Sequence, residues 1–251
     1  MKLPRHALWR HVYRLYEAID PWVKLSVPVE EKPQGARVLV LAPHIDDEVI
    51  GCGGTAIKHR QAGDRLWCLY LAGCTDERVQ EAERARAIIG FHRLIFWGYQ
   101  TRTLRDHPEA AETLAELLRE YRPDLIYVPF FLERHHDHVA TNHLLILALR
   151  RPKVPGCMIY AYEVWTPLVA NVLVDITDQA EAKREALRQF QSQIRSIDWE
   201  AGILALNRYR ATVSKARQYA EAFFRATSGR YARLWEQACG GKSPEDHGAE
   251  G

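Results

Sequence analysis

Short apolar runs alternate with longer stretches of helical periodicity from residue 37 onward. The run 37–42 (RVLVLA) is almost wholly apolar, as expected for a parallel strand buried on both faces. The same pattern predicts strands at 66–71, 94–97, 124–129, 157–162 and 171–175, and helices at 49–61, 76–89, 109–121 and 139–150. Strands that alternate with helices of this length indicate right-handed βαβ units and a parallel sheet.

The last third of the chain shows mainly helical periods. Leu187, Phe190, Ile194 and Ile197 predict one helix, and apolar positions between 216 and 224 predict another. We expect these helices to cover the sheet or to wall a site. The predicted fold is therefore α/β: a Rossmann-like three-layer sandwich with a mostly parallel sheet, an active site at the strand carboxyl ends and a helical C-terminal third.

The ends of the chain differ from this pattern. Residues 1–36 predict an amphipathic helix, over 3–23, followed by a linker. This helix either packs on its own domain or on a second copy of the chain, giving a homo-oligomer, or makes peripheral contact with an anionic membrane. Residues 37–239 are expected to form a single domain. Residues 240–251 contain no large apolar side chain and predict a disordered tail.

Composition excludes several classes of protein. The 251 residues carry 34 Lys plus Arg and 32 Asp plus Glu, and a net charge of +2 gives no reason to expect a nucleic-acid partner. The 5 cysteines contain no Cys-x-x-Cys pair, so neither a disulfide framework nor a thiolate zinc site is expected. No apolar segment approaches the roughly 18 residues of a membrane span, and the N-terminus lacks a signal-peptide core. These observations predict a cytoplasmic protein.

Two polar clusters follow predicted strands. Residues 43–48 read PHIDDE and residues 135–138 read HHDH. Because the carboxyl ends of parallel strands meet at one edge of the sheet, we expect the two clusters to meet. Taken separately, the acids of the first cluster suit a helix cap and the histidines of the second suit a solvated loop. Together they supply two histidines and a carboxylate, the ligand set of a catalytic divalent metal with an open position.

These motifs resemble those of the PIG-L/LmbE-like family of metal-dependent N-acetylglucosaminyl deacetylases. The family's Pro-His-Pro-Asp-Asp-Glu motif appears with Ile45 in place of its second proline, and its His-Pro-Asp-His motif appears as HHDH. Further similar segments are Thr75-Asp76 with Arg78 and Glu81, Tyr162-Glu163 with Trp165, Asp175-Ile176-Thr177, and Tyr219 to Phe223. The resemblance covers residues 37 to 226 and implies a single deacetylase domain.

The resemblance also implies a role for each residue of the two motifs. The implied metal ligands are His44, Asp47 and His138. Asp46 is implied as the general base, a protonated His135 as the group that polarises the scissile carbonyl, and Asp137 as a residue that orients a histidine of the second motif. The implied cofactor is one divalent ion, Zn²⁺ before Fe²⁺.

On the substrate side, the resemblance implies that Arg78 contacts the sugar. Glu163 and Trp165 are expected to form a pocket wall against a pyranose ring. The alternatives are an exposed helical pair of Arg78 with Glu81, and an ordinary core aromatic at Trp165. The chain departs from the family pattern after the third strand, where 97–101 read WGYQT without an aspartate, and this leaves the sugar and its aglycone open.

The predicted function is a metal-dependent hydrolase that removes the N-acetyl group from an N-acetylglucosamine-type sugar in a small glycoconjugate. One alternative keeps the site and changes the substrate, giving an amidase of another N-acyl conjugate. A second alternative is a non-haem iron oxygenase, because two histidines and a carboxylate also suit Fe²⁺. Such an oxygenase has no use for Asp46 as a base. A non-catalytic binding protein is disfavoured because both motifs are complete.

Overall fold

The structure, a computed structural model, describes residues 27–195 and 197–239. The amphipathic helix predicted at 3–23 and the tail predicted at 240–251 lie outside the described residues. Within them, every helix is too short or too polar to cross a bilayer.

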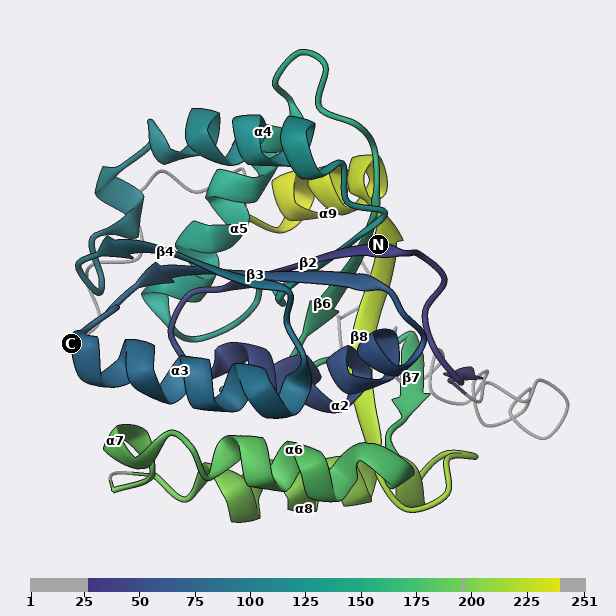
Figure 1. Cartoon of the computed structure of the whole chain (residues 1–251). Coiled ribbons are helices and arrows are strands. Elements are labelled where there is room, and N and C mark those ends of the chain that lie inside the picture. Colours follow the sequence, from purple (N-terminus) through teal and green to yellow (C-terminus); the bar gives the residue numbers. More distant parts are fainter. Residues whose placement is uncertain (1–26, 196, 240–251) are drawn as a thin grey trace, which may run out of the picture.

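The short apolar runs predicted as strands all lie in one sheet (Figure 1). Two further strands of this sheet were not predicted, and one of them lies in the predicted linker. Its strands within the described residues are β1 (Val29–Glu30), β2 (Arg37–Ala42), β3 (Arg65–Ala72), β4 (Arg93–Tyr99), β5 (Leu125–Pro129), β6 (Met158–Tyr162), β7 (Val172–Asp175) and β8 (Ala220–Thr227). They lie in the order β1-β7-β8-β6-β5-β2-β3-β4. Only β8 runs antiparallel to its neighbours, β6 and β7, so the mostly parallel sheet is confirmed.

Helices cover both faces of the sheet and complete the predicted three layers (Figure 1). One face carries α2 (Asp47–Gln61) and α3 (Asp76–Ile89). On the same side, α6 (Ala180–Leu187) and α7 (Gln191–Ile194) pack against these helices, and α8 (Trp199–Thr212) packs against β8. The other face carries α4 (Ala110–Tyr121), α5 (His136–Leu149) and α9 (Ser228–Cys239). Short 3-10 turns occupy Leu104–Asp106 and Thr177–Gln179. Each face of the sheet thereby buries its own apolar core against its helices.

The C-terminal third differs from the prediction in two places. The helix predicted between 216 and 224 is wrong, because Ala220–Thr227 is the strand β8. Alanines and a glutamate favour a helix locally, but pairing on both sides with β6 and β7 overrides that preference. The single helix predicted over 187–197 is also wrong, because α6 ends at Leu187 and a new helix begins at Gln191.

The strand order places the two predicted clusters side by side. From β2 the sheet grows through β3 and β4 on one side, and β5 and β6 lie on the other. The gap between the loops after β2 and β5 is therefore a topological switch point, where ligands bind in open α/β sheets. Val38 pairs with Leu125 and Val40 with Tyr127, so both strands end at the same edge, as predicted.

Helix α2 begins at this edge and packs unusually close to its neighbours. A Cβ atom on Gly51 would lie 2.1 Å from the Tyr162 ring, and one on Gly54 would lie 2.8 Å from Ile176. Only glycine permits this approach. The helix is kinked at Cys52, where φ is −143° and ψ is 18°. The kink separates the first turn, which carries the acidic residues, from the rest of α2.

Candidate metal centre and active site

The loop after β2 presents the first cluster in a strained conformation. Asp46 has φ 125°, a value that residues with a side chain rarely adopt. Its side chain makes no capping hydrogen bond to α2, so the helix-cap interpretation does not account for this residue. Its backbone N–H donates instead to Glu48 Oε2 at 3.1 Å. Strain of this kind concentrates at functional sites, and here it fixes the carboxyl group of Asp46 beside that of Asp47.

The loop after β5 leads directly into α5. His135 is the N-cap of this helix, because its Nδ1 accepts the backbone N–H of Asp137 at 3.2 Å. Asp137 and His138 lie in the first turn and are buried. The second motif is therefore part of a helix start rather than a solvated loop.

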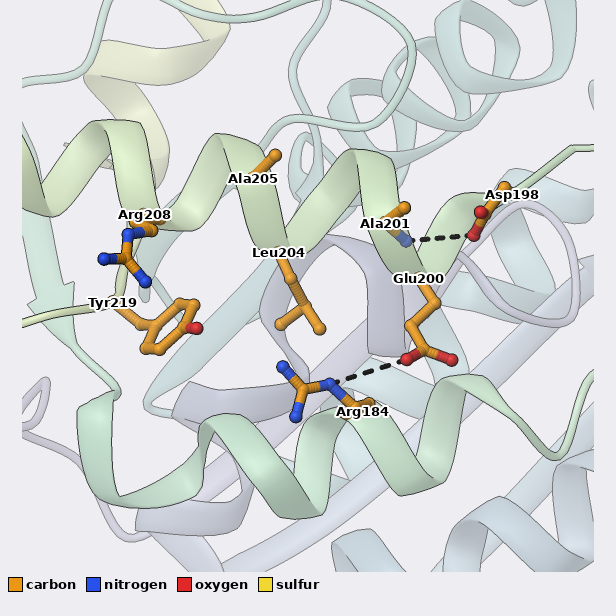
Figure 2. Close-up of a pocket in the computed structure, with 8 residues that line it drawn as sticks. All are labelled: Arg184, Asp198, Glu200, Ala201, Leu204, Ala205, Arg208 and Tyr219. Carbon is orange, nitrogen blue, oxygen red and sulfur yellow. Dashed lines mark hydrogen bonds and ion pairs between the residues drawn. The ribbon is translucent and has the colours of Figure 1, made fainter.

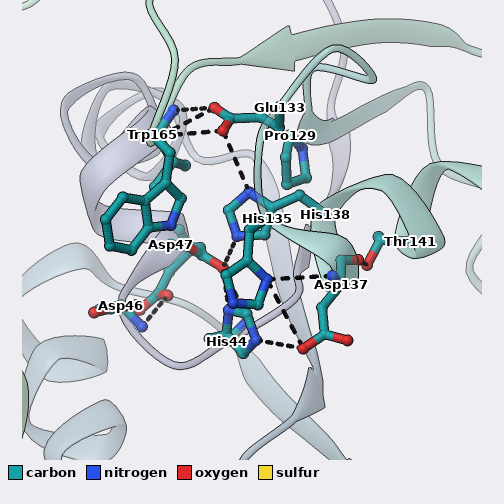
Figure 3. Close-up of polar contacts among 12 residues, drawn as sticks. His44, Asp46, Asp47, Pro129, Glu133, His135, Asp137, His138, Thr141 and Trp165 are labelled. Atoms are coloured by element: carbon teal, nitrogen blue, oxygen red, sulfur yellow. Dashed lines mark hydrogen bonds and ion pairs between the residues drawn. The ribbon is translucent and has the colours of Figure 1, made fainter. Parts of the chain in front are cut away.

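Three side-chain atoms of the two loops surround one point (Figure 3). Asp47 Oδ2 lies 3.2 Å from His138 Nε2 and 3.4 Å from His44 Nδ1. Ligands bound about 2.0–2.1 Å from a tetrahedral metal lie about 3.4 Å apart, so these spacings suit a shared ion. His135 adds a further ring nitrogen, since His44, His135 and His138 each offer one within 4.8 Å of the others.

The buried nitrogens of His138 also indicate a metal. Neither Nδ1 nor Nε2 of this fully buried ring has a hydrogen-bond partner among the described residues. A buried polar atom without a partner is costly, and a cation beside Asp47 would satisfy Nε2. The residues present therefore fit a divalent metal ion.

Asp137 contacts a different histidine from the one expected. Its Oδ2 accepts a hydrogen bond from His44 Nε2 at 2.8 Å, whereas His135 Nδ1 lies 3.9 Å away. The reason is that His135 Nδ1 already accepts the backbone N–H of Asp137. The Arg102 N–H donates to both carboxylate oxygens of Asp137, at 3.0 and 2.9 Å. The Asp137 side chain thus orients the first-motif histidine, while its backbone N–H holds His135 of the second motif.

The carboxylates set the protonation of His44. Burial alone would lower its pKa, but hydrogen bonds to Asp137 and Asp47 outweigh burial and raise the pKa of His44 to about 10. Burial would likewise raise the pKa of Asp47, but His138 and His44 hold it well below its usual range. Asp47 is therefore an anion, and a metal that binds His44 must displace a proton.

The pKa of Asp46 is shifted in the opposite direction to that of Asp47. Burial raises its pKa well above the usual value, and the neighbouring charges of Asp47 and Glu48 raise it further. Burial also raises the pKa of Glu48 to about 7, against the hydrogen bond that Tyr70 donates to it. A carboxyl group with a raised pKa is suited to exchanging protons near neutral pH.

His135 is neutral rather than protonated. Burial lowers its pKa to about 4, and the charges of His44 and His138 add to this effect. Because Nδ1 accepts an N–H, the ring proton belongs on Nε2. This corrects the expectation of a charged His135, but it leaves the ring with one hydrogen-bond donor.

Glu133 is a candidate functional residue that was not predicted from the sequence. It is buried, and its carboxylate accepts the backbone N–H groups of Val164 at 2.7 Å and Trp165 at 3.1 Å. Its Oε2 lies 3.9 Å from His138 Nδ1. The only signal in the sequence is an acid in the loop that leads to the HHDH motif.

The predicted substrate residues lie in different surroundings. Arg78 donates to Gln193 Oε1 at 2.7 Å, and its charge lowers the pKa of Asp46 against the larger effects that raise it. Glu81 accepts from the Ser192 backbone N–H and hydroxyl, each at 2.7 Å. The alternative of an exposed helical pair is therefore wrong, because both side chains reach from α3 to the α7 segment.

Trp165 lies beside the candidate site. It is 44% exposed, so it is not an ordinary core aromatic. Its ring is nearly parallel to that of His135, with centroids 6.5 Å apart, and meets the Trp199 ring edge-on at 4.8 Å. Figure 3 shows the Trp165 ring on the same side of the histidine cluster as Asp46. This arrangement suits a wall for a sugar ring.

Glu163 is buried and paired with Arg210. It is 4% exposed, and its carboxylate accepts from Arg210 at 3.1 and 2.6 Å and from the Leu168 N–H at 2.9 Å. These contacts disagree with the predicted role in the pocket wall, because the buried charge is already neutralised and hydrogen-bonded. Glu163 supports the loop after β6 instead.

A separate hollow of about 390 Å³ lies between α6 and α8 (Figure 2). Its lining includes Arg184 and Glu200, which form an ion pair at 3.5 Å, and Tyr219. No residue of the two motifs lines it. This hollow is therefore distinct from the candidate metal centre.

Comparisons with known proteins agree with the motifs. Residues 39–149 match the PIG-L family, described as GlcNAc-PI de-N-acetylase. The chain is 27% identical over 193 residues to the diacetylchitobiose deacetylase of Thermococcus kodakarensis, covering 65% of this chain and 72% of that protein.

Two solved structures share the fold. The N,N'-diacetylchitobiose deacetylase of Pyrococcus horikoshii superposes with a TM-score of 0.69 at 25% identity, covering 79% of this chain and 86% of that one. A conserved protein of Thermus thermophilus superposes with a TM-score of 0.68 at 28% identity, covering 75% of this chain and 93% of that one. With the family match over residues 39–149, these comparisons show that the chain is similar to PIG-L/LmbE-like deacetylases in sequence and in fold.

Proposed function

We propose that this chain is a metal-dependent N-deacetylase that releases acetate from an N-acetylglucosamine-type sugar in a small glycoconjugate. The observation that carries this proposal is the placement of Asp47 Oδ2 between two histidine nitrogens, 3.2 and 3.4 Å away, beside the strained Asp46. The related deacetylases support the same reaction class.

The proposed metal ligands are His44 Nδ1, Asp47 Oδ2 and His138 Nε2. Two nitrogens and one carboxylate oxygen suit Zn²⁺, and the same set accepts Fe²⁺. A divalent ion bound there lowers the pKa of water toward 7 and polarises an amide carbonyl. Asp137 holds His44 in place by accepting a hydrogen bond from its other ring nitrogen, Nε2.

Asp46 acts as the general base. Its carboxyl group adjoins that of Asp47, and it is not among the three ligands. It accepts the proton of the attacking water and passes it to the nitrogen of the leaving amine. Its raised pKa makes the carboxylate a stronger base than an exposed aspartate, which suits it to take a proton from water and then to pass that proton to the amine.

His135 stabilises the developing charge on the amide oxygen. The proton on Nε2 provides a hydrogen-bond donor, while the Asp137 N–H fixes the ring through Nδ1. A neutral imidazole is sufficient for this role, since the donor need only strengthen as the oxygen becomes anionic. Trp165 is proposed to pack on the sugar ring, and Arg78 to contact its hydroxyl groups or a nearby anionic group.

A cytoplasmic location is part of this proposal. Among the described residues the cysteines form no disulfide bond, which accords with a reducing compartment. The small substrate proposed here requires no membrane-spanning element.

The test is release of acetate by zinc-loaded protein from a panel of N-acetylated sugars and conjugates. We expect release from at least one N-acetylhexosamine conjugate, with or without molecular oxygen, and loss of release after metal removal by a chelator. Release that required oxygen would instead favour an oxygenase. The absence of acetate from every compound would contradict the deacetylase assignment.

A further inference from the structure

We propose that Glu133 is a positioning residue that couples the metal centre to the substrate wall. In this role it orients His138 on one side and holds the backbone of residues 164–166, here called the Trp165 segment, on the other. The inference rests on the metal centre of the proposed function. It adds a residue outside both sequence motifs, and a route by which metal binding orders the substrate side.

The contact with His138 is the first observation. His138 Nε2 faces Asp47, which leaves Nδ1 as the ring atom that needs a hydrogen-bond acceptor. Nδ1 is buried without a partner, and Glu133 Oε2 lies 3.9 Å away with both side chains fully buried. A histidine that binds a metal through one nitrogen commonly donates its other N–H to a carboxylate, which fixes the tautomer and strengthens the ligand. Glu133 Oε2 lies on this side of the ring, and a shift of about 1 Å would bring it within hydrogen-bond distance of Nδ1.

The second observation is the other set of contacts made by the same carboxylate. Glu133 Oε1 accepts the N–H groups of Val164 at 2.7 Å, Trp165 at 3.1 Å and Thr166 at 3.3 Å. Three successive backbone N–H groups thus point at one buried charge. Glu133 is 31 to 33 residues away from these partners in the chain. The carboxylate therefore fixes the segment that carries the Trp165 ring.

Metal binding and the order of the Trp165 segment are coupled because one carboxylate, that of Glu133, contacts both His138 and this segment. Ordering of His138 by a metal fixes the Glu133 carboxylate, and this in turn favours the hydrogen-bonded state of the Trp165 segment. Linkage makes the effect reciprocal, so loss of the carboxylate charge weakens metal binding.

Glu163 provides a matched control, because it also binds the loop after β6 that Glu133 holds. It is also a buried glutamate that accepts a backbone N–H of this loop, from Leu168 at 2.9 Å. Its other contact is Arg210 rather than a histidine of the metal centre. Glu163→Gln therefore disturbs the loop without changing the surroundings of His138.

The first measurement is the zinc affinity of the full chain, determined by competition with a chromophoric chelator. Glu133→Gln places an amide where His138 needs an acceptor, so we expect binding about 10–100-fold weaker than in wild type. Glu163→Gln should keep the wild-type affinity. An unchanged affinity in Glu133→Gln, or an equal loss in both variants, would overturn the proposal.

The second measurement is hydrogen exchange of the amides of Val164, Trp165 and Thr166 in wild-type protein, with and without zinc. We expect zinc to slow exchange there, and the zinc effect to disappear in Glu133→Gln. A purely structural role would speed exchange in the variant equally with and without metal. If the variant does not fold, the wild-type protein alone still tests the coupling. The coupling is rejected if zinc does not change the exchange rates of these three amides in wild type. Neither measurement uses a substrate, so failure of acetate release bears only on the proposed function.

Discussion

Asp46 combines an unfavourable backbone conformation with a buried carboxyl group. A residue with a side chain at φ 125° costs about 1–3 kcal/mol, which the surrounding contacts must offset. The strain is explained if the carboxyl group is needed at this point for proton transfer. Two substitutions distinguish the effect of the Asp46 side chain on catalysis from the effect of its backbone conformation on stability.

Asp46→Asn should keep the metal and lose about 10²–10⁴-fold in kcat, because the amide cannot accept the proton of water. Asp46→Gly should be equally inactive yet no less stable than wild type, since glycine tolerates this conformation. Steady-state kinetics, metal analysis and urea unfolding test the pair. Turnover near the wild-type rate in either variant would remove Asp46 from the role of base.

The raised pKa of His44 predicts that metal binding depends on pH. Its pKa of about 10 in the metal-free protein means that the ring is protonated at pH 7 and must lose a proton to bind a metal. Zinc affinity should therefore rise with pH, by about tenfold per unit for each proton displaced. The corresponding stability of the metal-free protein is fully present below about pH 6.5 and is lost as pH rises through about 10.

Calorimetry of zinc binding in buffers of different ionisation enthalpy counts the protons released. We expect about one proton from His44 between pH 7 and 8. Binding heats that do not depend on the buffer, together with a pH-independent affinity, would show that His44 is not a ligand.

At the scale of helices and strands, a buried ion pair between α6 and β8 supports the kink in α2. Lys183 of α6 donates to the Ile50 carbonyl at 2.9 Å and pairs with Glu221 of β8 at 2.7 Å. Glu221 accepts the N–H groups of Gly54 and Thr55, each at 2.8 Å. The pair therefore satisfies backbone groups on both sides of the kink, next to the turn that carries Asp47.

Lys183→Met should destabilise the protein by about 3–5 kcal/mol, because it leaves the Glu221 charge buried without its partner. Urea unfolding measures the change, and the exposed Lys153→Met serves as the control, with an effect within about 0.5 kcal/mol. A cost below about 1 kcal/mol for Lys183→Met would mean that the ion pair does not support α2.

Strands buried on both faces could be predicted from the sequence, because a run such as 37–42 has few alternatives. β8 could not, since AEAFFRAT favours a helix and becomes a strand only by pairing with β6 and β7. The two motifs could be predicted because their residue types carry the chemistry. Glu133 could not, because its role depends on backbone groups more than 30 residues away.

At the scale of the whole molecule, the strand order brings the loops after β2, β5 and β6 to one edge of the sheet. The proposed metal centre lies in the first two loops, and Trp165, backed by Trp199, lies on the third. The α7 segment joins this edge through Arg78 and Glu81. An edge built from this many segments offers more contacts than one sugar ring requires.

We therefore expect a hexosamine with an additional group to have a higher kcat/KM than free N-acetylglucosamine, because remote contacts can raise turnover. Arg78→Ala should lower kcat/KM while leaving metal content unchanged. Kinetics on a series of N-acetylhexosamine conjugates, with metal analysis, provide the measurement. If free N-acetylglucosamine is as good a substrate as every conjugate, the extended contact surface has no part in recognition.

The most direct test of the account is the metal content of the purified protein and of three single variants, measured by elemental analysis. Wild type loaded with zinc should hold about one ion per chain, and His44→Ala, Asp47→Ala and His138→Ala should each lose most of it. A wild-type stoichiometry in all three variants would contradict the metal centre, and with it the proposed reaction.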